Sequence, residues 1–276
     1  MRLTAIVAAG LAGCAWGGGT DSHGILGTDA RPPVDARPGD GGGDAQAPTE
    51  HVLLSEIALA GVGAEFLEVT NPTTQAFALD QVYLSDAGDY WKQPVGGISL
   101  NAADFIVKFP AAASLAPGAT ITIAIGGATA FMAIYGVAPT YSIADGTMTA
   151  VNVGMTPSLT DAGEVVALFQ WNGTDELVKD VDLMVAGVPS NINQFVSKSG
   201  VMQGASTYKT DANTIAAQPA APIAGQSTKR IAAEGMLEMH GGTGNGITGH
   251  DETSENTAMT WDTTFTAPTP GQVPAF

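Results

Sequence analysis

The residues best suited to chemistry lie together near the C-terminal end of the chain. His240 precedes a close group formed by His250, Asp251, Glu252 and Glu255. Carboxylates beside a histidine can bind a metal ion, and carboxylate oxygens are ligands that Ca²⁺ prefers. The spacing matches no zinc template such as His-Glu-x-x-His, and the chain has no Gly-x-Ser-x-Gly nucleophile elbow. One hypothesis is therefore that His250, Asp251, Glu252 and Glu255 bind a metal ion. If the site is catalytic, the protein would be a metal-assisted hydrolase centred on Asp251.

The single cysteine, Cys14, follows a short apolar run at the N-terminus. The chain begins Met-Arg, and residues 3–11 are small or aliphatic, a run shorter than the about 20 residues of a membrane span. A charged start, a short apolar centre and small residues at the end are typical of a secretory signal peptide, here residues 1–13. The ending Leu-Ala-Gly-Cys resembles a bacterial lipobox, which is cleaved before the cysteine that then carries the lipid.

Lipidation of Cys14 makes a membrane the expected partner and an extracytoplasmic location the expected address. Ala15 stands where Asp would signal inner-membrane retention, so the resemblance implies the outer membrane in a cell that has one. The lone cysteine also allows no intramolecular disulfide and, once lipidated, no thiol nucleophile. Residues 14–50 are dominated by Gly, Asp, Pro, Ala and Thr. They predict a disordered linker with a reach of about 30 Å.

Composition limits the classes of protein that the chain can form. Of 276 residues, 45% are hydrophobic, which is enough for a sizeable core. The 35 glycines, the 16 prolines and a charged content of only 13% suit a turn-rich β architecture. The net charge of −17 repels phosphate backbones and argues against a nucleic-acid partner. No pattern in the sequence predicts a cofactor.

The elements that would carry these residues are mostly short strands. Three apolar runs within residues 53–86 are separated by Gly-Val-Gly and Asn-Pro, which indicates strands and turns. After a Pro-Gly turn, residues 120–125 alternate Thr and apolar residues, so the isoleucines should face a core and Thr122 should face water. Phe131 and Tyr135 lie on one side of a predicted short helix that ends at a glycine.

The second half of the chain predicts a hairpin and a long insertion. Two apolar runs on either side of Asn172-Gly173 are a strong β-hairpin signal. Residues 187–224 are polar and rich in Ala and Pro, which indicates a long surface insertion. Tyr90 and Trp91 fall in an irregular stretch, where we expect exposed aromatic rings, and Trp171 stands beside the hairpin turn.

The order of these motifs resembles the lamin tail domain, an immunoglobulin-like β-sandwich, over residues 51–271. The resemblance rests on the strands of 53–86, on the turn and strand of 115–125, on the helix that follows, on a hairpin and on a C-terminal segment. The hairpin positions are Gly163, Glu164, Leu168, Asn172, Gly173 and Asp180, and the closing positions are Ser227, Arg230, Asp251, Thr253, Asn256, Trp261 and Thr269-Pro270-Gly271. The family usually has Leu at the position of Thr228, so the Ser-x-x-Arg motif departs from its pattern there.

The resemblance implies a structural role for the C-terminal residues. Asp251 and Asn256 would satisfy turn amides, and Trp261 would complete the core, in preference to a metal or catalytic site. Some relatives have nuclear and DNA-associated roles, which the acidic charge argues against here. The expected fold class is thus all-β, a β-sandwich over residues 51–273 with one short helix, after a signal peptide and a linker.

The functional expectation is a lipid-anchored, non-catalytic binding or structural module at the cell surface or in the periplasm. Its partner would be an extracytoplasmic protein or a glycan. Two alternatives stay open: the metal-assisted hydrolase, and a polysaccharide-binding module that stacks sugars on Tyr90, Trp91 or Trp171.

Overall fold

The computed structural model describes residues 50–274, apart from 60, 62, 162, 188–195, 211–220, 224, 234–243, 254–256 and 265–266. Some sequence predictions lie outside the described residues, namely the signal peptide 1–13, Cys14, the linker as far as residue 49, His240, Glu255 and Asn256. Within the predicted insertion 187–224, most of the residues that the structure describes are residues 196–210.

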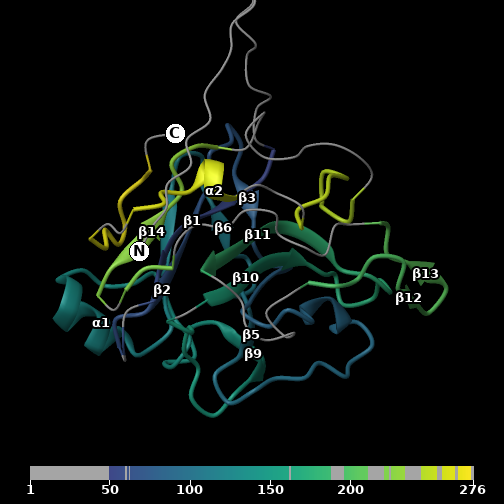
Figure 1. Ribbon diagram of the computed structural model, residues 1–276, viewed down its shortest axis with the longest axis horizontal. Helices are drawn as coiled ribbons and strands as arrows, with labels where there is room; N and C mark the ends of the chain where they lie inside the picture. The colour runs from purple at the N-terminus through teal and green to yellow at the C-terminus, as the bar shows by residue number, and fades with distance from the viewer. Residues whose placement is uncertain are drawn as a thin grey trace, which may run out of the picture. The chain divides into compact units, whose positions relative to one another are not determined.

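Two five-stranded sheets form the body of the described domain (Figure 1). The first sheet has the order β14 (Ser227–Lys229), β1 (Leu53–Ala58), β2 (Phe66–Thr70), β7 (Thr120–Ala124) and β8 (Tyr141–Ser142). The second has the order β11 (Lys179–Gly187), β10 (Gly163–Gln170), β4 (Val82–Ser85), β5 (Phe105–Lys108) and β9 (Thr149–Val153). Neighbouring strands are antiparallel, except for β7 and β8, which run parallel.

Smaller elements connect and cover the sheets. The two-stranded ribbons pair β3 (Phe77–Ala78) with β6 (Ser114–Leu115) and β12 (Met202–Gln203) with β13 (Ser206–Thr207). The helical segments are the 3₁₀ turn η1 (Tyr90–Lys92), α1 (Ala128–Tyr135) and the short α2 (Thr257–Thr260). The predicted helix is confirmed as α1, which buries Phe131 and ends at Gly136 with a φ of 73°.

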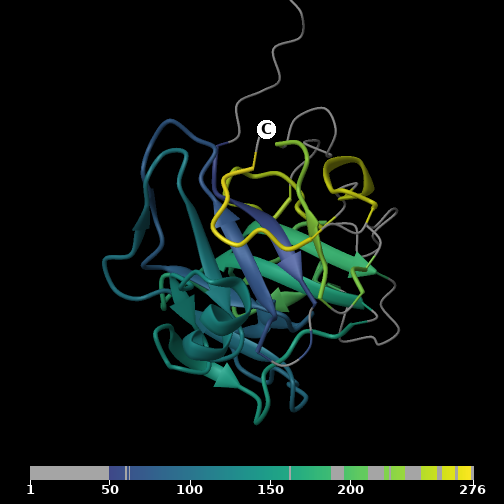
Figure 2. The same cartoon turned by 90° about the vertical axis from the view of Figure 1, so that its left-hand side faces the viewer.

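The first core lies between the two sheets, which Figure 2 shows packed across one another. Inward residues of β1, β2 and β7 meet inward residues of β4, β5, β10 and β11. The isoleucines of residues 120–125 all belong to this core, as their alternation predicts. The expected all-β sandwich is therefore confirmed.

The other face of the second sheet is also covered, and this forms a second core. Its strands point Phe169 and other apolar side chains away from the first sheet. Tyr90 and Trp91 pack on this face and are only 0% and 7% exposed, so the expectation of exposed rings there is wrong. Residues 196–208 supply the buried Tyr208 to the same core, so this part of the predicted surface insertion is a structural layer.

Thr122 departs from the expected solvent-facing position. It is only 4% exposed and donates a hydrogen bond from Oγ1 to Glu68 on the neighbouring strand, at 2.7 Å. Gly271 N also donates to Glu68 Oε1, so the C-terminal segment lies over this face of the first sheet. The alternation of residues 120–125 is correct, but both faces of the strand are covered.

The predicted hairpin is confirmed as β10 and β11, with Gly173 at a φ of 84° in the connection. The pairing shifts register within it, because Leu168 faces Asp182 while Phe169 faces Asp180. The extra residue in β11 is a β-bulge. In a regular strand, residues two apart point to the same face, and the bulge allows Asp180 and Asp182 to point to opposite faces.

Candidate functional site

The C-terminal residues selected from the sequence adopt turn and packing contacts. Asp251 Oδ1 accepts hydrogen bonds from Thr253 N at 2.9 Å and from Thr253 Oγ1 at 2.7 Å, which is the expected bracing of a turn. His250 contributes its main-chain oxygen to Gly246 N. Glu252 is buried, with Oε1 4.0 Å from His51 Nε2.

A metal centre made by these residues stays a prediction. Within the described ranges, no three His, Cys, Asp or Glu side chains are grouped so that they could hold a metal ion. Glu255 is a member of the predicted set that falls outside those ranges. The described part of the set supplies main-chain and turn contacts and the buried pair of Glu252 with His51.

Asp182 forms a buried ion pair on the inner face of β11. Arg230 Nη2 lies 3.0 Å from each carboxylate oxygen of Asp182, and Arg230 Nε donates to Leu54 O at 2.8 Å. Leu54 N donates back to Asp182 Oδ2 at 2.5 Å. The guanidinium also lies over the buried ring of Trp261, 5.3 Å from its centre. The predicted closing residues Arg230 and Trp261 thus join β14, β1 and β11 at one point.

Asp180 forms a second buried cluster on the outer face of β11. Tyr90 donates its hydroxyl proton to Asp180 Oδ1 at 2.6 Å, and Lys198 Nζ lies 2.5 Å from Asp180 Oδ2. Lys198 Nζ also reaches the Tyr90 hydroxyl at 3.3 Å. The side chains of Lys198 and Asp180 are 0% and 1% exposed. The residues of this cluster lie in η1, in β11 and in the segment after residue 195.

Sequence reasoning missed this cluster, although a signal for it was present. Lys198 lies in a polar segment without periodicity, so nothing local marks it as buried. Asp180 and Asp182, however, interrupt an otherwise apolar strand. Carboxylates in a buried strand need compensating partners, and that need points to basic residues elsewhere in the chain.

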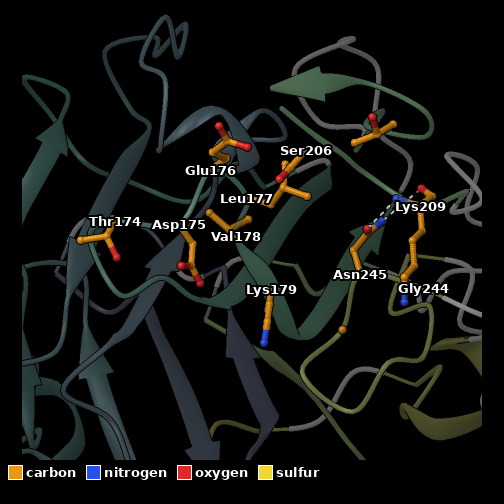
Figure 3. A pocket seen from close by; sticks show the side chains of 12 residues that line it. Thr174, Asp175, Glu176, Leu177, Val178, Lys179, Ser206, Lys209, Gly244 and Asn245 are labelled. Carbon is orange, nitrogen blue, oxygen red and sulfur yellow. Dashed lines mark hydrogen bonds between the residues drawn. The ribbon is translucent and has the colours of Figure 1, made fainter. Parts of the chain in front are cut away.

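A cavity of about 490 Å³ opens beside the start of β11 (Figure 3). Side chains from the hairpin connection, from β13 and from the 244–246 segment line it, most of them polar. They are Thr174, Asp175, Glu176, Leu177, Val178, Lys179, Ser206, Thr207, Lys209, Gly244, Asn245 and Gly246. The lining offers carboxylates, ammonium groups, hydroxyls and an amide, which together can bind a small polar ligand.

The walls of this cavity are fixed by hydrogen bonds. Asn245 Oδ1 accepts from Lys209 N at 2.8 Å, and Asn245 Nδ2 donates to Lys209 O at 3.2 Å (Figure 3). Glu176 accepts from Ala205 N at 3.0 and 2.9 Å, and these bonds lower the pKa of Glu176. Asp180 N donates to Asn245 O at 2.9 Å, which ties the 244–246 segment to β11.

Two glycines allow this segment to approach its neighbours. A Cβ at Gly244 would meet His250 O at 2.0 Å, and a Cβ at Gly246 would meet Glu252 Oε1 at 2.7 Å. A Cβ at Gly246 would also meet the main-chain oxygen of His250 at 2.9 Å, so a side chain at either position would force the backbone to move. The glycines of the Gly-x-Gly around Asn245 are therefore needed to place that amide in the cavity wall.

A group of buried carboxyl groups lies at the far end of the hairpin from its turn. Burial raises the pKa of Glu164 to about 7, and burial together with the charge of Glu164 raises the pKa of Asp86 well above its ordinary value. Asp86 Oδ1 accepts from Phe105 N at 2.6 Å, and Glu164 accepts from Thr160 N at 2.8 Å. Glu164 can therefore hold a proton near neutral pH, so we expect the stability of the fold to depend on pH.

A smaller cavity of about 340 Å³ lies by the C-terminal segment. Thr269 donates from N and from Oγ1 to the two oxygens of Glu56, each at 2.9 Å. Burial raises the pKa of Glu68 to about 7 there, and Gly271 N donates to the same side chain. The predicted Thr-Pro-Gly ending is thus attached to the first sheet by two glutamates.

Among the described residues, no helix is long and apolar enough to cross a membrane. No protein-family model matches the chain, and no curated protein matches it. One similar solved structure is a DUF4876 family protein from Bacteroides thetaiotaomicron, with 15% sequence identity and a TM-score of 0.40. The likeness covers 83% of this chain and 72% of the other.

Proposed function

We propose that the protein is a membrane-anchored, extracytoplasmic β-sandwich that binds a small polar ligand or a partner's polar side chains without catalysis. The lipobox-like residues before Cys14 support the anchor, and the Gly- and Pro-rich residues after it support a spacer. The observation that carries the binding role is the cavity of about 490 Å³ beside β11.

The chemistry of the cavity favours binding over reaction. Glu176 and Asn245 are both used to hold the walls, so their acceptor and donor groups are already committed to main-chain partners. Asp175, Lys179 and Lys209 are exposed and offer both signs of charge to a ligand. A partner with both carboxylate and amine or hydroxyl groups suits this lining.

In intact cells, a photo-crosslinking residue placed at Asp175 should capture the partner. Thr129 on α1 is the matched control position, because it is exposed and α1 lies at the opposite side of the domain from β12 and β13 (Figure 1). Capture at Asp175 should disappear when Lys179 and Lys209 are both changed to Ala. Equal capture at Thr129, or capture that survives the double substitution, would reject the cavity as the binding site.

A polysaccharide ligand is the alternative form of this function. Trp171 is half-buried on the same connection that lines the cavity, and its Nε1 donates to Asp175 O at 2.8 Å, which fixes the ring. Tyr90 and Trp91 are buried, so Trp171 is the ring among the three that a sugar could reach. On a glycan array, binding that is lost in Trp171→Ala would support this alternative, and an array without binding would reject it.

A further inference from the structure

Lys198 and Asp180 are held against each other where water is excluded. Their Nζ and Oδ2 atoms are 2.5 Å apart and both side chains are almost fully buried. Among the lysines that the structure describes, Lys198 is the one with a fully buried side chain. The Tyr90 hydroxyl contacts both partners, at 2.6 Å from Asp180 Oδ1 and 3.3 Å from Lys198 Nζ.

We propose that Lys198 and Asp180 react within the folded domain to form an intramolecular amide cross-link, with the Tyr90 hydroxyl as the assisting group. The link would join the start of β11 to the segment that covers the outer face of the second sheet. The chain has a single cysteine, so an amide of this kind could provide the internal covalent brace that a disulfide cannot.

The reaction needs an amine and a carboxylic acid in place of the charged pair. Burying an ammonium and a carboxylate together is costly, because each loses its hydration. Transfer of one proton from Lys198 to Asp180 leaves an amine and a carboxylic acid with the same atoms and no charge. The second core surrounds the pair with apolar and aromatic groups, including Phe169, whose ring centre is 5.1 Å from that of Tyr90.

The reaction balances without any further reactant. The lone pair of Lys198 Nζ attacks Asp180 Cγ, and the new N–C bond moves electrons onto Oδ1, where the Tyr90 hydroxyl stabilises the developing charge. The C=O bond to Oδ1 then re-forms and the bond from Cγ to Oδ2 breaks. Oδ2 leaves with its own proton and one from Nζ, so the products are an amide and one molecule of water.

Proximity lowers the activation barrier of such a step. Two groups fixed in a reactive arrangement can show effective concentrations on the order of 10⁵ M or more. Lys198 and Asp180 come from segments 18 residues apart that the second core fixes in place. Because the site is buried, the released water has little chance to return and hydrolyse the amide.

Intact-mass spectrometry of the denatured full chain tests the proposal directly. We expect the folded protein to weigh less than its sequence by one water, and Lys198→Arg, which keeps the charge but cannot form the amide, to have the full mass. Trypsin should fail to cut after residue 198 in the denatured protein, and tandem spectra should contain a branched peptide that joins residues 180 and 198. A full mass together with cleavage after Lys198 would overturn the proposal.

Two controls keep the result specific. Asp40-Gly41 and Asp145-Gly146 can also lose one water by forming succinimides. That loss would persist in Lys198→Arg and would leave tryptic cleavage after Lys198 intact, so this pattern would count against the cross-link. Tyr90→Phe keeps the ring and removes the hydroxyl, and we expect cross-linking to be slowed on the order of 10²-fold in protein of unchanged circular dichroism. An unchanged rate would remove Tyr90 from the mechanism.

Discussion

Replacing Arg230 by methionine removes the positive half of the ion pair that joins β14, β1 and β11. Asp182 would keep its hydrogen bond from Leu54 N, but both 3.0 Å contacts to the guanidinium would be lost. Leu54 O would also lose its donor, Arg230 Nε. The substitution therefore takes the guanidinium charge away from a fully buried carboxylate.

The structure sets the size of the effect. Removing one partner of a buried ion pair costs about 3–5 kcal/mol, because the other charge stays without compensation. Methionine fills most of the space of the arginine stem, so little of the loss comes from an empty volume. Adding Asp182→Leu removes the remaining charge as well. The double variant should therefore lie within about 2 kcal/mol of the original protein, the remainder being the hydrogen bonds that Leu54 N–H and Leu54 C=O both lose.

Urea unfolding monitored by tryptophan fluorescence measures these differences, since Trp261 lies over the guanidinium. Lys229→Met is the matched control, because Lys229 is the neighbouring residue, is partly exposed and carries the same charge. It should change the free energy of unfolding by at most about 0.5 kcal/mol. An Arg230→Met loss below about 1 kcal/mol would refute the reasoning. The reasoning would also be refuted if the loss of unfolding free energy in the double variant equalled the sum of the losses in the two single variants.

Three further outcomes are expected. The pKa of Glu164 is raised in the folded state from its ordinary value of 4.5. Above pH 4.5 the unfolded state therefore releases a proton that the folded state keeps. Thermal or urea unfolding should therefore show stability that is full below about pH 4.5 and falls by up to about 3 kcal/mol as the pH rises through about 7. Glu164→Gln should reduce this slope, and a stability that rises over that range would contradict the assignment. Cys14→Ala should release the protein from the membrane fraction, as read by fractionation, and retention would reject the lipid anchor. Added Ca²⁺ or EDTA should leave the melting temperature unchanged, whereas a Ca²⁺-dependent rise that Glu255→Gln abolishes would establish the metal site instead.

The strands, the helix and the hairpin could be predicted from the sequence because their signals are local. Asn-Pro and Pro-Gly punctuation, the alternation of residues 120–125, the spacing from Phe131 to Gly136 and the Asn172-Gly173 turn each act within a few residues. The expectation that Trp261 belongs to the core came from the family resemblance, and Trp261 does lie in the first core. The anchor at Cys14 and the metal hypothesis on Glu255 are likewise sequence predictions, and they still await measurement.

Which face of each element is covered depends on tertiary packing that local patterns do not reveal. Thr122 and Tyr90 occupy positions that a two-layer sandwich would leave exposed, yet the C-terminal segment covers one and the second core encloses the other. The bulge in β11 sends Asp180 and Asp182 to opposite faces, and each then pairs with a base from a distant segment. Whether a charged residue is buried depends on the segments that pack against its strand, and these lie outside its local sequence. Local periodicity could therefore mark the two carboxylates as unusual. It could not identify Lys198 and Arg230 as their partners.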